Sequence, residues 1–165
     1  MGNVHDVAAR IARHFPTGLS TMKLQKLTYF ALGWGFALLG RPIFTEKFQA
    51  WRNGPVCYEL FTRHRREYMI HGWPLGDETN LEPEDKIVID AVLKNYGALS
   101  GLQLSDLTHE PLAPWSRIRR ENGVSAGEAS KLEIPDAYMQ EYFDEITGMA
   151  SRRKAAEAAV DQINW

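Results

Sequence analysis

The segment LTYFALGWGFALLG, residues 27 to 40, is the longest apolar run of the chain and decides its fold class. At 14 residues it is too short to span a bilayer. Apolar residues recur through it and the preceding turn at intervals of three and four, the spacing of one helix face: Leu24, Leu27, Ala31, Trp34 and Leu38. Most positions between them are also apolar, which is typical of a helix buried at the centre of a helical domain. We therefore predict a mainly α, single compact multi-helix domain around a central apolar helix over about residues 22 to 39.

Two glycines, Gly33 and Gly35, lie inside this predicted helix. Each costs about 1 kcal/mol of helix propensity relative to alanine. We expect the close approach of another backbone to compensate for that cost. Ser20 or Thr21 is expected to cap the start of the helix, and Gly40 to end it.

The composition is that of an ordinary globular protein. Of 165 residues, 44% are hydrophobic and 24% are charged, and the net charge of -2 provides no general attraction to DNA or to anionic membranes. A single cysteine excludes an internal disulfide. The N-terminal residues lack the apolar segment of a secretory signal, so we expect a cytoplasmic protein.

The rest of the chain also has mainly helical spacing, with one exception. Residues 43 to 52 lose the helical period, so a short extended or β element is predicted there. Asn53 and Gly54 are expected to form a turn, and Pro55 to open the next helix at its first position. We predict one domain over residues 1–148 and an Ala-rich, charged tail over residues 149–165 that is helical or partly disordered.

Few residues suggest catalysis. Cys57 would lie in the first turn of the helix predicted at Pro55, where the helix N-terminus and Arg52 would lower the pKa of its thiol. The sequence places no histidine beside it as a base, so we interpret Cys57 as a packing residue and a cysteine-dependent enzyme as a less favoured alternative.

Cofactor motifs are also missing from the sequence. The fold could bring His64, His71 and His109 together around a metal, but their spacing matches no zinc motif. No stretch has the order of a phosphate-binding P-loop. We therefore predict no enzyme, no catalytic residue, no metal and no cofactor.

Basic residues form three local clusters, and each could contact phosphate: Arg63 to Arg66 with His64; Arg117, Arg119 and Arg120; Arg152, Arg153 and Lys154. A DNA-binding regulator is thus an alternative function, although the net negative charge disfavours nucleic acid as the main partner. Tryptophan, tyrosine and arginine are also the residues most often found at protein-binding hot spots. On that basis we predict a partner-binding surface formed by Trp51, Arg52, Tyr58, Arg63 and Arg66.

Three blocks of the sequence resemble the Panacea domain family, earlier grouped with phage-associated GepA-like proteins. They are KLQKLTYFALGWGFALLGRPIFTEKFQAWRNGPVCYELF (23–61), LSDLTHEPLAPW (104–115) and IPDAYMQEYF (134–143), and they occur in the expected order. The family pattern falls on Lys23, Leu24, Lys26, Leu27, Tyr29, Phe30, Trp51, Gly54, Pro55, His109, Pro114 and Trp115. Most of these residues are apolar or set backbone turns, so we expect mostly structural roles for them.

The resemblance implies a function as the antitoxin of a toxin–antitoxin pair. Such a protein would neutralise a protein toxin encoded by an adjacent gene through direct contact, and would need no cofactor. Some family members carry an additional DNA-binding module, which we do not expect within residues 1–165. Others pass the toxin to a cellular protease, so a proteolytic adaptor is a second alternative.

Overall fold

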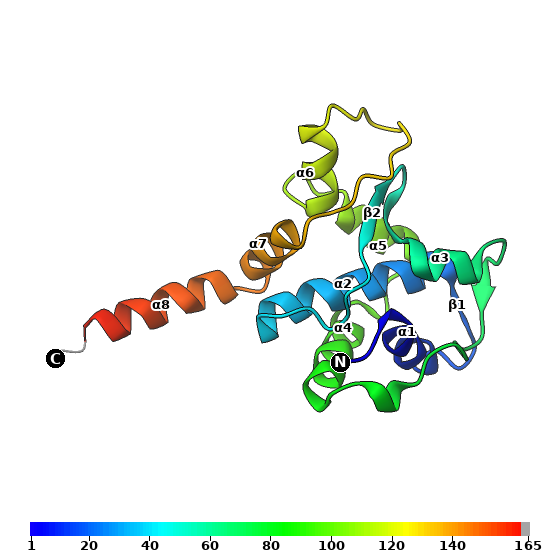
Figure 1. Cartoon of the computed structure of the whole chain (residues 1–165), viewed down its shortest axis with the longest axis horizontal. Helices are drawn as coiled ribbons and strands as arrows, with labels where there is room; N and C mark the ends of the chain where they lie inside the picture. Colours follow the sequence, from blue (N-terminus) through cyan, green and yellow to red (C-terminus); the bar gives the residue numbers. More distant parts are fainter. Residues whose placement is uncertain (163–165) are drawn as a thin grey trace.

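A computed structural model describes residues 1 to 162 and confirms the mainly α fold (Figure 1). Over these residues the chain forms eight α-helices, one short 3-10 helix and two small two-stranded sheets. The helices are α1 Val4–Arg13, α2 Thr21–Leu39, α3 Tyr58–His64, α4 Pro83–Tyr96, α5 Gly101–Thr108, α6 Pro114–Glu121, α7 Asp136–Ile146 and α8 Met149–Asp161. The 3-10 helix, η1, is Glu78–Asn80.

The predicted central helix is α2. It runs through the middle of the molecule and packs against α1, α4, α5, α7 and the hairpin strand β3 (Figure 1). Every residue from 24 to 33 is buried. The Ser20 hydroxyl caps the helix by accepting a hydrogen bond from the Lys23 N–H, and Gly40 ends it in the left-handed conformation (φ 70°). This apolar helix therefore organises the core, as its sequence predicts.

At both glycines inside α2 the closest neighbouring atoms belong to side chains, so the expectation that they admit another backbone was wrong. A methyl group at Gly33 would overlap the ring of Phe143 on α7. At Gly35 the nearest atom is a methyl carbon of Ile43, 2.8 Å from where a Cβ would stand. Removing the Cβ thus allows α7 and the segment after α2 to pack closely on the central helix.

A β-hairpin follows in place of the helix predicted at Pro55. Strand β2 (Phe48–Trp51) includes part of the extended element expected near 43–52, and it pairs antiparallel with β3 (Gly54–Cys57). The next helix, α3, begins only at Tyr58, so the prediction of its start was wrong. Gly54 has a φ of +126°, which suits glycine after a tight turn.

Pro55 is tolerated in this hairpin because its position requires no N–H donor. It lies opposite Ala50. The Ala50 N–H donates to the Leu132 carbonyl oxygen, and the Ala50 carbonyl accepts a hydrogen bond from Arg119. The Ala50 groups therefore point away from Pro55, and the strand pair loses no hydrogen bond at the proline.

Two features complete the described fold. Short strands β1 (Leu19–Ser20) and β4 (Met69–Ile70) form the second sheet, which the sequence pattern did not predict. Helix α8 extends away from the body of the molecule (Figure 1), and its residues 151–161 are all exposed. Residues 163–165 of the predicted tail lie outside the described residues. No helix within residues 1–162 is both long and apolar enough to cross a membrane.

Candidate partner-binding site

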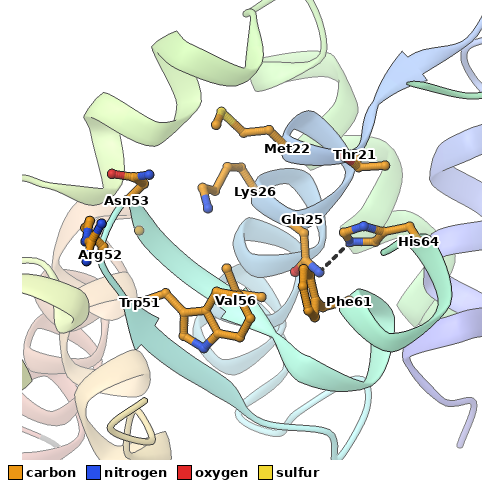
Figure 2. Close-up of a pocket in the computed structure, with 11 residues that line it drawn as sticks. Thr21, Met22, Gln25, Lys26, Trp51, Arg52, Asn53, Val56, Phe61 and His64 are labelled. Carbon is orange, nitrogen blue, oxygen red and sulfur yellow. Dashed lines mark hydrogen bonds between the residues drawn. The ribbon is translucent and has the colours of Figure 1, made fainter. Parts of the chain in front are cut away.

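A pocket of about 230 Å³ opens between the N-terminal half of α2, the β2–β3 hairpin and α3 (Figure 2). Four side chains provide its apolar walls: Met22 from α2, Trp51 and Val56 from the hairpin, and Phe61 from α3. The polar and charged side chains that line it are Thr21, Gln25, Lys26, Arg52, Asn53 and His64. No aspartate or glutamate is among the lining residues. The pocket therefore combines apolar walls with positive charge.

The aromatic wall is rigid because its rings contact one another. The Trp51 and Phe61 rings meet edge to face with centroids 4.8 Å apart, and the Tyr58 ring lies 6.4 Å from that of Trp51. The Trp51 Nε1–H donates to the Gln49 side chain at 2.7 Å. Trp51 is half-buried and Tyr58 is 41% exposed, so this cluster faces both the pocket and solvent.

The hairpin turn beside the pocket is held from behind by residues of α5 and α6. The Trp115 Nε1–H donates to the Trp51 carbonyl oxygen at 2.7 Å, and the Ser105 hydroxyl donates to the Asn53 carbonyl oxygen at 2.8 Å. The ring of His109 lies 4.0 Å from that of Trp115. The second block of the family pattern thus positions the turn that belongs to the first block.

A buried network around Gln25 forms the floor of the pocket. The Gln25 side-chain oxygen accepts from the Cys57 N–H (2.8 Å), so its amide nitrogen is the donor to the Cys57 carbonyl (3.1 Å) and to His64 Nε2 (3.0 Å). His64 Nε2 must then be an acceptor, which assigns the imidazole as neutral with its proton on Nδ1. Burial also lowers the pKa of His64, in agreement with a neutral ring. The floor is consequently preorganised and its hydrogen-bonding groups are already in use.

Lys26 is the exceptional residue of the pocket. It is 3% exposed, and its Nζ donates to the Pro55 carbonyl oxygen at 2.8 Å. Among residues 1–162, no carboxylate lies within ion-pair distance of this ammonium. Burial lowers the pKa of Lys26 to about 8. Sequence reasoning assigned Lys26 to the family pattern but did not identify it as a site residue, because burial without a partner is visible only in three dimensions.

The structure brings together three of the five residues predicted to bind a partner. Trp51, Arg52 and Tyr58 lie at the pocket or beside it, and Arg52 is exposed. Arg63 is two positions after Phe61 on α3, a rotation of about 200°, so it lies on the opposite side of that helix. Arg66 follows the end of α3, exposed and with a φ of 72°.

Two residues that the sequence prediction omitted join this group. Phe61 lines the pocket, and the Arg65 guanidinium lies 5.4 Å from the centre of the Phe61 ring. Positions 58, 61 and 65 follow one another at steps of three and four residues, and this spacing in the sequence could have indicated the face. We define the aromatic–cationic surface as Trp51, Arg52, Tyr58, Phe61 and Arg65.

The other residues of the family pattern lie mostly inside the molecule. The buried ones are Leu24, Leu27, Tyr29, Phe30, Gly54, Pro55, Pro114 and Trp115. Lys23 is half-buried, and its Nζ donates to the Gly97 carbonyl oxygen at 2.7 Å. His109 is exposed and ends α5.

Cys57 does not have the environment that the sequence suggested. It is fully buried at the end of β3, and burial raises the pKa of its thiol to about 11. The expected position in the first turn of a helix was therefore wrong, and so was the expected lowering of its pKa. No cluster of three or more potential metal ligands occurs in the described part of the chain.

Arginines of the second and third basic clusters are engaged in intramolecular contacts. Arg119 is buried and donates to the carbonyl oxygens of Ala50, Ser125 and Glu128. Arg117 forms ion pairs with two glutamates, of which Glu141 is 2.9 Å away. In the third cluster, Arg153 pairs with Asp144. These arginines hold the fold together, so they are poorly placed to contact phosphate.

Comparison with known proteins points to one family. Residues 24–116 match the family model described as antitoxin SocA-like, Panacea domain. Over 137 residues the chain is 31% identical to the antitoxin SocA of Caulobacter vibrioides (strain NA1000 / CB15N). The matched region covers 76% of this chain and 72% of that protein. No solved structure matches the chain significantly.

Proposed function

This chain belongs to the antitoxin SocA-like, Panacea domain family, and we propose that it neutralises a protein toxin, encoded by an adjacent gene, through direct protein–protein contact. The family match over more than half of the chain is the observation that carries this proposal. We further propose that the protein acts in the cytoplasm and is not an enzyme. The raised pKa of the buried Cys57 thiol supports the second point.

The aromatic–cationic surface is the proposed contact with the toxin. Protein interfaces are enriched in tryptophan, tyrosine and arginine, and their hot spots cluster around well-packed anchors. Here Tyr58 is 41% exposed beside the edge-to-face pair of Trp51 and Phe61, and two exposed arginines flank the cluster. Arg63 and Arg66 remain predicted contacts, although neither belongs to the aromatic–cationic surface.

The first test is rescue of growth and copurification. The adjacent gene product is expressed alone and together with this chain, and growth is recorded. We expect toxicity alone, rescue on co-expression, and a complex that copurifies. If the chain neither restored growth nor copurified with that product, the proposal would be rejected.

Two neighbouring charge reversals, one on α3 and one directly after its end, test which surface makes the contact. Arg65→Glu and Arg63→Glu change the charge equally, but only Arg65 lies beside the Phe61 ring. We expect Arg65→Glu to weaken the complex about tenfold or more and Arg63→Glu to have a smaller effect, as measured by calorimetry. Arg152→Glu on the distant α8 provides a control outside α3 (Figure 1). Equal effects of all three variants would point to nonspecific electrostatics and against this surface.

Direct neutralisation is separated from proteolytic hand-over by purified components. If contact suffices, the purified chain inhibits the purified toxin without any protease. If inhibition were absent in vitro while the toxin disappeared from co-expressing cells, hand-over to a protease would replace the proposed mechanism.

A further inference from the structure

The ammonium group of Lys26 retains unused hydrogen-bonding capacity inside the pocket. A lysine ammonium carries three N–H donors, and Lys26 uses one of them on the Pro55 carbonyl oxygen at 2.8 Å. Buried charges are normally paired because removing an ion from water is expensive. Lys26 is more than nine-tenths buried, yet no carboxylate of residues 1–162 pairs with it. The anion that would complete this site is therefore not supplied by the described part of the chain.

The neighbouring groups narrow the chemistry of that missing anion. Gln25 and the Nε2 atom of His64 are occupied by their own network, so they leave the floor neutral. The lysine and arginine side chains that line the pocket are those of Lys26 and the exposed Arg52, and no aspartate or glutamate lies among the lining residues to neutralise them. Trp51, Val56 and Phe61 supply an apolar wall on the same pocket (Figure 2). A matching ligand carries a negative charge next to an apolar group.

The size of the pocket limits how much of a partner can enter. About 230 Å³ accommodates the side chains of one or two residues but not a folded element. The charge is set back inside the pocket, whereas phosphates of a nucleic-acid backbone are contacted mainly by side chains that reach out from the surface. The small volume of the pocket and the recessed position of its charge therefore favour a peptide segment over a nucleic acid.

We propose that this pocket binds an acidic peptide segment of the toxin, whose carboxylate side chain pairs with Lys26 and whose adjacent apolar side chain packs against Trp51 and Phe61. This inference rests on the proposed function and makes it specific, because it names the anchor within the interface. In the free protein the buried Lys26 ammonium bears a desolvation cost that no ion pair offsets. A carboxylate of an acidic partner offsets this cost and a neutral partner does not, so the pocket selects for acidic partners.

The test compares two lysines of the same helix with each other. Lys26→Met removes the ammonium from the pocket, while Lys23→Met removes one that binds the Gly97 carbonyl and does not line the pocket. We expect Lys26→Met to weaken toxin binding at least tenfold and Lys23→Met to change it less than threefold, with both variants folded by circular dichroism. Each acidic residue of the toxin is then changed to its amide. One of these changes should weaken binding to the wild type but not to Lys26→Met.

A second arm uses small probes and does not depend on the toxin. Wild type and Lys26→Met are titrated with 3-phenylpropionate, its uncharged amide and AMP, while the Trp51 indole N–H is observed by NMR. We expect the carboxylate to shift this signal in the wild type alone and the amide to have a weaker effect. A shift caused by AMP without one by 3-phenylpropionate would overturn the peptide proposal in favour of a phosphate ligand.

The two arms separate failure of this inference from failure of the proposed function. If the toxin is neutralised but Lys26→Met binds it as tightly as the wild type, the inference is wrong and the function stands. If no toxin binds but 3-phenylpropionate shifts the Trp51 signal only when Lys26 is present, the proposed function fails and the chemistry of the pocket stands. If the toxin does not bind and 3-phenylpropionate leaves the Trp51 signal unchanged, both are rejected.

Discussion

Replacement of Lys26 by methionine should stabilise this protein while it impairs partner binding. Burial lowers the pKa of Lys26 from 10.5 to about 8. A difference of this size corresponds to about 3 kcal/mol against the charged form in the folded state. Methionine leaves the Pro55 carbonyl without its donor, which costs about 1 kcal/mol. The expected net gain in the free energy of unfolding at pH 7 is therefore about 2 kcal/mol.

The lowered pKa of Lys26 also determines how the stability difference between the wild type and Lys26→Met changes with pH. Below pH 8 both states are protonated, and the folded state bears the full cost of the buried charge. Between pH 8 and 10.5 only the unfolded state keeps the proton, so Lys26 makes wild-type stability rise with pH. The advantage of Lys26→Met should shrink across this interval and reverse by its end, because the lost hydrogen bond is then the only difference.

Urea denaturation followed by circular dichroism at several pH values measures both quantities. The raised pKa of Cys57 opposes the rise above pH 9, since the unfolded thiol ionises first. Its contribution cancels in the difference between the two variants, which is therefore the quantity to plot. A Lys26→Met protein less stable than the wild type at pH 7, or a difference that does not change with pH, would refute the reasoning.

Four further predictions concern packing and reactivity. Gly33→Ala forces a methyl group into the Phe143 ring and should lower the free energy of unfolding by about 1–3 kcal/mol in urea denaturation; an unchanged midpoint would mean that the ring moves freely. Arg119→Lys keeps the charge, but its single nitrogen cannot reach the three carbonyl oxygens that the two separated guanidinium nitrogens of Arg119 contact, so a loss of about 2 kcal/mol is expected in the same assay, and a neutral effect would contradict the structural role of the guanidinium. Because the pKa of Cys57 is about 11, DTNB at pH 7.5 should label it rapidly only after unfolding, and fast labelling of the folded protein would revive it as a nucleophile. Ending the chain at Gly148 removes an exposed helix together with Arg153, the ion-pair partner of the buried Asp144, so the midpoint of thermal unfolding should fall by about 2–4 °C while growth rescue persists; an unchanged midpoint would contradict the structural role of Arg153, and loss of rescue would show that residues 149–165 belong to the functional unit.

Local patterns were sufficient wherever one element could be read alone. The apolar periodicity of α2 predicted a buried central helix because a helix without a polar face has no stable place at the surface. Ser20 and Gly40 marked its ends because capping depends on neighbouring backbone groups. The β-hairpin was missed at Pro55 because this proline suits the start of a helix equally well. Only the hydrogen bonds of Ala50 to Leu132 and Arg119 show that the strand needs no donor there.

The candidate site was predicted only in part, because residue type can be read from the sequence whereas the position of a side chain in the fold cannot. Residue type alone indicated Trp51, Arg52 and Tyr58 as partner contacts, and these lie together in the structure. In the structure Arg65, and not Arg63, is their neighbour, because Arg65 lies beside the Phe61 ring. Which side of the short helix α3 the core covers could not be read from the sequence.

The sequence by itself determined a mainly helical chain, its central helix and its membership of an antitoxin family. Those properties depend on periodicity and on an ordered pattern of residues, both of which can be read along the chain. Only the tertiary structure decided that Lys26 is a buried cation with no carboxylate partner among residues 1–162 and that burial raises the pKa of the Cys57 thiol. Desolvation depends on what surrounds a side chain in space, and residues from α2, the hairpin and α3 must come together before it can be judged.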